Sequence, residues 1–123
     1  MYLKNSKTIV IKIGSSLIIN DKGILRKKWL SEFIKDIKKL KNEKKNIVIV
    51  SSGAIALGCK KLGLNKKNLK LDKSQAVASI GQIELMNLFK KKFNSKKINL
   101  SQILITLEDT EQRRRAINAK RTL

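Results

Sequence analysis

The sequence contains no histidine, no proline and a single cysteine, Cys59. Without histidine the chain lacks the usual general base and the usual transition-metal ligand, and one cysteine cannot form an internal disulfide bond. No apolar run reaches the length of about 18 residues that a transmembrane helix needs, and the polar first residues do not resemble a signal peptide. These absences predict a cytoplasmic protein whose chemistry depends on Lys, Ser, Asp, Glu or backbone amides.

Acidic residues are also scarce, with 9 Asp and Glu against 29 Lys and Arg and a net charge of +20. One interpretation is nucleic-acid binding, because clustered basic residues neutralise phosphates. The alternative is a biased genome, since the abundant Lys, Ile and Asn have A/T-rich codons. The basic residues are spread along the chain and aromatic residues make up only 4%, which leaves few rings for stacking on bases. We therefore favour the genomic explanation and expect neither a nucleic-acid nor a membrane partner.

Apolar periodicity predicts alternating strands and helices within one domain. Strands are predicted at 7–13, 46–50 and 98–106, with 17–19 as an extension of the first. Helices are predicted at 26–44, 54–57 and 74–92 and from 108 onward, and a loop at 58–71. The resulting order, β-α-β-α-α-β-α, is typical of a mainly parallel sheet with helices on both faces.

Ligands of open parallel sheets bind at the carboxyl ends of the strands, so the first candidate site follows the strand at 7–13. There Gly14 would let the backbone approach a ligand, and the amides and hydroxyls of Ser15 and Ser16 would hold phosphate oxygens. Lys12 would neutralise charge on a phosphoryl group in transfer. A simple turn with a solvated lysine explains the same residues, and the Walker A spacing is absent.

The second candidate site follows the strand at 46–50, where Ser52, Gly53 and Ala54 lead into a predicted helix. A helix start offers free N–H groups and the positive end of the helix dipole, which suit a carboxylate or a phosphate. Ser52 could also cap this helix, and capping is compatible with ligand binding.

Four segments, in order along essentially the whole chain, resemble the glutamate 5-kinases of the amino-acid kinase family. They are 9–16 (I-V-I-K-I-G-S-S), 48–58 (V-I-V-S-S-G-A-I-A-L-G), 80–82 (I-G-Q) and the third predicted strand with the helix that follows it, at 103–123. Kinases for carbamate, uridylate, aspartate or acetylglutamate share the fold and the first lysine, so a different carboxylate or phosphate substrate is the alternative. Their turn after the second strand is usually composed differently.

The resemblance implies a three-layer αβα sandwich and ATP with Mg²⁺ as cofactors. It implies transfer of phosphate from ATP to the γ-carboxylate of L-glutamate, which is the first step of proline biosynthesis. It assigns catalysis to Lys12, no metal ligand to this chain, and two groups of binding residues. Those for the ATP phosphates are Lys12, Gly14, Ser15 and Ser16, and those for glutamate are Ser52, Gly53, Ala54 and Asn118.

Two departures from the family pattern bear on these expectations. Arg121 stands where the family usually has a residue that helps to bind the ammonium group of glutamate, and an inward-pointing arginine would repel that group. The family's kinase domain is also longer than this chain. We therefore expect residues 1–123 to be a truncated N-terminal half of such a domain, inactive without a complementing C-terminal half, and we also consider a homo-oligomer.

Overall fold

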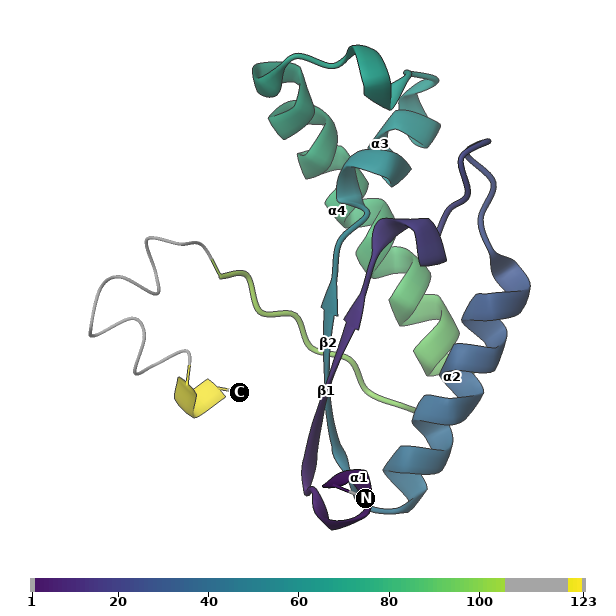
Figure 1. Cartoon of the computed structure of the whole chain (residues 1–123), viewed down its shortest axis with the longest axis vertical. Helices are drawn as coiled ribbons and strands as arrows, with labels where there is room; N and C mark the ends of the chain where they lie inside the picture. Colours follow the sequence, from purple (N-terminus) through teal and green to yellow (C-terminus); the bar gives the residue numbers. More distant parts are fainter. Residues whose placement is uncertain (1, 106–119, 123) are drawn as a thin grey trace.

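The structure is a computed structural model and describes residues 2–105 and 120–122 (Figure 1). Two strands, β1 (Thr8–Ile13) and β2 (Asn46–Ser51), form a parallel pair. The helices are α1 (Tyr2–Asn5), α2 (Lys27–Asn42), α3 (Ala54–Leu62) and α4 (Leu71–Asn94), with short 3₁₀ helices η1 (Ser15–Leu17) and η2 (Lys66–Asn68). The predictions of strands at 7–13 and 46–50 and of a helix at 26–44 are thus confirmed to within two residues at either end.

The parallel pairing follows from the crossover that α2 makes between the strands, because parallel strands cannot be joined by a tight turn. Ile9 pairs with Ile47 and Ile11 with Ile49, so the isoleucines of both strands lie on one face of the sheet. This face contacts the apolar stripes of α2 and α4. Its buried cluster contains Ile13 from β1, Leu30, Ile34 and Ile37 from α2, and Leu85, Phe89 and Phe93 from α4.

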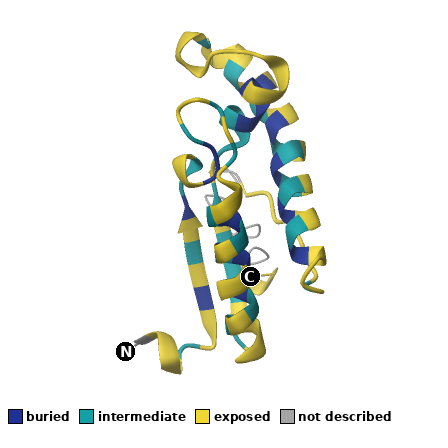
Figure 2. Ribbon diagram, turned by 90° about the vertical axis from the view of Figure 1, so that its right-hand side faces the viewer, coloured by how far each residue is buried: buried dark blue, intermediate teal, exposed yellow. Residues whose placement is uncertain are grey.

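The opposite face of the sheet carries exposed side chains. Val10 is 65% exposed and Val50 is 49% exposed, and Lys12 lies on the same face. In Figure 1 both α2 and α4 lie on the other side of the strands, and Figure 2 shows the exposed residues that alternate along β1 with buried ones. The described residues therefore form two layers, and the second helical layer of the expected sandwich is not among them.

The prediction of a third strand at 98–106 was wrong for its described part, because residues 98–105 form no strand. The described sheet has two strands only, and apolar residues adopt strand structure only beside a hydrogen-bonded neighbour. Ile98 packs against the core, whereas Leu104 is 73% exposed. Residue 106 and the predicted helix from 108 lie outside the described residues, apart from 120–122, which are helical.

Three further boundaries differ from the predictions, and one of them is the start of α4, which lies at Leu71 and not at residue 74. Residues 17–19 do not extend β1, because η1 turns the chain and Ile19 then bridges to Leu25. The predicted loop at 58–71 begins later, because α3 continues to Leu62 and ends at Gly63, whose φ of 67° is the left-handed conformation that favours glycine. Within the described ranges, none of the helices has the length and apolar character that crossing a membrane requires.

Candidate active site

The two predicted turns meet at the carboxyl ends of β1 and β2. Ile13 is paired with Ser51 in the sheet, and the amide of Ser52 donates to the carbonyl of Ile13 at 3.2 Å. A Cβ placed on Gly53 would lie 3.6 Å from both Cα and Cβ of Ser15. The residues that follow the two strands therefore lie beside one another, as the parallel register requires.

The turn after β1 presents backbone donors. Leu17 donates to the carbonyl of Gly14 at 3.1 Å, and Ile18 donates to Ser15 at 3.0 Å. The first amides of a 3₁₀ helix have no partner within it, which leaves those of Ser15 and Ser16 available to a ligand. Gly14 has an extended backbone, with φ of −73° and ψ of 155°, and no atom lies within 4 Å of its Cβ position. The missing side chain thus leaves open space beside these donors.

The turn after β2 starts α3. Gly53 is the N-cap residue, its carbonyl accepts from Leu57 at 2.9 Å, and its φ of 122° is one that other residues rarely adopt. The first amides of α3, beginning at Ala54, have no partner within the helix and lie at the positive end of its dipole. Capping by Ser52, which the sequence allowed, does not occur, because Gly53 occupies the cap position and no side chain caps the helix. The helix start is therefore left open to an anion.

Lys12 supplies a positive charge beside these amides. Its side chain is exposed, and it lies opposite Val50 on the sheet face that α2 and α4 leave uncovered. Neither ion pair in the described part of the chain includes a site residue, since they join Lys35 to Glu32 and Lys61 to Glu84. The charge of Lys12 is thus not neutralised by a described carboxylate, which suits an anionic ligand.

A close crossing of α3 and α4 fixes the position of the second turn. A Cβ on Gly81 would lie 1.5 Å from the carbonyl oxygen of Ala54, and one on Gly58 would lie 2.2 Å from that of Val77. Only glycine permits such an approach of two backbones, so α4 supports the first turn of α3 directly. In the sequence, Gly81 stands out only within a family motif, and Gly58 is predicted to begin a loop. The presence of these two glycines in successive apolar segments was the sequence feature that could have predicted the close crossing.

Not every predicted site residue can be placed. Asn118 lies outside the described residues, so its assignment to the glutamate site stays a prediction. Arg121 is exposed in the short helical segment 120–122. In the described ranges no group of three or more Asp, Glu, Cys or His residues could hold a metal ion.

Comparison with known proteins identifies the family. Residues 7–123 match the sequence profile of the Amino acid kinase family. The glutamate 5-kinase of Pelagibacter ubique (strain HTCC1062) is 73% identical over 99% of this chain, and that of Nitrobacter hamburgensis is 48% identical over 100% of it. The chain covers 33% of each of these two relatives, about a third of their length. From the profile match and these identities, the chain belongs to the amino acid kinase family.

Proposed function

We propose that this chain provides the phosphate- and glutamate-binding part of a glutamate 5-kinase. The reaction is the ATP-dependent phosphorylation of the γ-carboxylate of L-glutamate, which yields L-glutamyl 5-phosphate and ADP. The observation that carries the proposal is the position of Gly53 beside Ser15, where a Cβ on Gly53 would lie 3.6 Å from Cα and Cβ of Ser15. This arrangement brings two separate sets of unpaired amides to one end of the sheet, where a phosphate and a carboxylate would lie side by side. The names of the related kinases support the same substrate.

The two turns suit different ligand groups. Lys12, Gly14, Ser15 and Ser16 would hold the phosphates of ATP, while Ser52, Gly53 and Ala54 would hold glutamate at the start of α3. A carboxylate is already a nucleophile, so an in-line attack needs positioning and charge stabilisation more than a general base. The absence of histidine from the sequence is compatible with this chemistry.

Several expectations remain predictions within this proposal. Mg²⁺ is expected to accompany ATP. A complementing C-terminal half would supply the rest of the kinase, because residues 1–123 cover 33% of the Pelagibacter relative. A cytoplasmic location is also expected, and a homo-oligomer is the alternative to a complementing half. The alternative is another carboxylate or phosphate substrate within the family.

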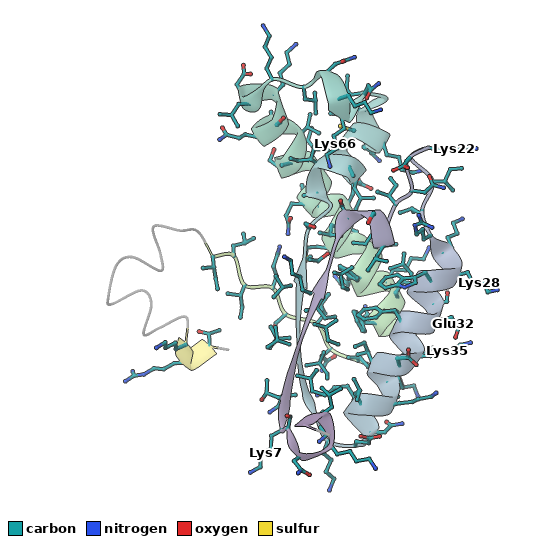
Figure 3. The ribbon with its side chains drawn as sticks, viewed as in Figure 1. Lys7, Lys22, Lys28, Glu32, Lys35 and Lys66 are labelled. Carbon is teal, nitrogen blue, oxygen red and sulfur yellow. The ribbon has the colours of Figure 1, made fainter. Side chains whose placement is uncertain are left out.

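The test replaces the matching third of the Pelagibacter ubique glutamate 5-kinase with this chain. We expect the chimera to release ADP in the presence of L-glutamate, and not with aspartate, acetylglutamate or carbamate. Lys12→Met should lower kcat by about 100-fold, because a charge that stabilises the transferring phosphoryl group is lost. The matched control is Lys7→Met, which removes the same charge at the far end of the strands (Figure 3) and should leave kcat unchanged.

Two results would contradict the proposal. A folded chimera that turns over another substrate of the family in preference to glutamate would overturn the assigned substrate. Equal kcat values for Lys12→Met and Lys7→Met would overturn the assigned role of Lys12.

A further inference from the structure

Arg26 connects the turn after β1 to the start of α2. Its Nε donates to the carbonyl oxygen of Ser16 at 2.6 Å, and its backbone amide donates to Ile18 at 2.8 Å. The first of these bonds is short because its donor is charged. Arg26 lies ten residues further along the chain than Ser16, so this contact is set by the fold and not by local geometry.

The start of α2 is an unfavourable place for this residue. Arg26 is the N-cap of the helix, its side chain makes no capping hydrogen bond, and Lys27 and Lys28 follow it. Positive charges are disfavoured at the positive end of the helix dipole, and no acidic residue lies in the first turn to offset them. Arginine is also not among the residues that cap helices well. Residues that are unfavourable for the local secondary structure are expected mainly at functional sites.

The bond to Ser16 restrains one peptide group. The carbonyl of Ser16 and the amide of Leu17 belong to the same planar unit. The amide of Leu17 donates to Gly14 at 3.1 Å, while the carbonyl accepts from Arg26. Rotation of this peptide plane would break both hydrogen bonds. Arg26 therefore stabilises the observed orientation of this peptide, and in the observed turn the amides of Ser15 and Ser16 are unpaired.

We propose that Arg26 is a positioning residue for the phosphate-binding turn. Its hydrogen bond from the start of α2 restrains the peptide between Ser16 and Leu17. The amide donors of Ser15 and Ser16 thereby keep the arrangement that a phosphate group needs. The restraint follows from the hydrogen bonds themselves, whereas the identity of the ligand rests on the proposed function.

Three variants separate the hydrogen bond from the charge. In Arg26→Gln the side-chain amide nitrogen lies the same number of bonds from Cα as Nε does, so a neutral donor can still reach Ser16. Arg26→Met has a side chain as long as that of glutamine, but it has no hydrogen-bond donor. Lys27→Met is the matched control, because it removes one positive charge from the neighbouring exposed position.

The first measurement needs no ligand. Amide hydrogen exchange in the ¹⁵N-labelled chain reports how often the bond from Leu17 to Gly14 opens. Arg26→Met should speed the exchange of Leu17 about tenfold, the effect of losing one charge-assisted hydrogen bond at the surface. Arg26→Gln and Lys27→Met should remain within about threefold of the unmodified chain. Equal exchange in Arg26→Met and the unmodified chain overturns the inference.

The second measurement titrates inorganic tripolyphosphate, which carries the phosphate groups of ATP, and follows the amide signals of Ser15 and Ser16. Arg26→Met should weaken the apparent affinity about tenfold, and Arg26→Gln should retain most of it. If Arg26→Gln is as weak as Arg26→Met, charge alone is responsible and the positioning role is wrong. If tripolyphosphate shifts neither amide while Leu17 exchange responds as expected, the restraint by Arg26 is supported and the proposed phosphate site fails.

Discussion

Replacing Gly81 with alanine should separate α3 from α4. The added Cβ would lie 1.5 Å from the carbonyl oxygen of Ala54 and 2.7 Å from the amide nitrogen of Gly58, and both are backbone atoms. Cβ atoms essentially never approach other atoms within 3.0 Å. The helices must therefore move apart by about 1.5 Å, which weakens the contacts all along the crossing.

The expected loss of stability follows from two opposing effects. Overpacking against backbone costs about 3–4 kcal/mol, at or above the upper end of its usual range, and alanine returns about 1 kcal/mol through its higher helix propensity. The net decrease in the free energy of unfolding is about 2–3 kcal/mol, which lowers Tm by about 10 °C for a chain of this size. Because Ala54 begins α3, its amide should also shift relative to Ser15.

Urea unfolding followed by circular dichroism measures the free energy of unfolding. The matched control is Gly14→Ala, the same chemical change at a position with no atom within 4 Å of the new Cβ and an ordinary φ of −73°. It should change the free energy of unfolding by less than about 1 kcal/mol. Equal stability of the two variants would refute the close backbone crossing of α3 and α4.

Three further substitutions test other parts of the fold by the same unfolding measurement. Gly53→Ala should cost about 1–3 kcal/mol through backbone strain at φ of 122°, with little steric clash, since its nearest atoms lie at 3.6 Å; a neutral result would contradict this conformation. Phe93→Ala, at a core position that is 2% exposed, should cost about 3–5 kcal/mol, and a loss below about 1 kcal/mol would place Phe93 outside the core. Val10→Thr, at a position that is 65% exposed, should stay within about 0.5 kcal/mol, and a large loss would mean that another element covers this face.

The sequence predicted the parts of the fold that have a clear periodicity. The β-branched runs at 7–13 and 46–50 indicate strands, and the spacing of Leu30, Ile34 and Ile37 indicates a helix. The meeting of Gly14 and Gly53 was equally predictable, because parallel strands end at a common edge. The site's two turns could thus be expected to lie together before any coordinates were known.

Other features depend on tertiary contacts that leave little local signal. The apolar run at 98–105 suits a strand, yet no described strand pairs with it. Gly58 weakens a helix by propensity, yet α3 continues through it because Val77 packs against its backbone. The sequence around Arg26 does not indicate its hydrogen bond to Ser16, because that contact depends on the path of the loop between η1 and α2.

The alternation of side chains along β1 has a consequence for how its pairing with β2 is selected. A displacement of the strand by one residue would exchange its two faces. Ile11 and Ile13 would then turn toward water, and Lys12 would enter the apolar cluster beneath α2. An ammonium group without a partner is costly to bury, so misaligned pairings are penalised by the same charge that is proposed to bind ATP. Lys12 would in this way help to select the alignment that brings the two glycine turns together.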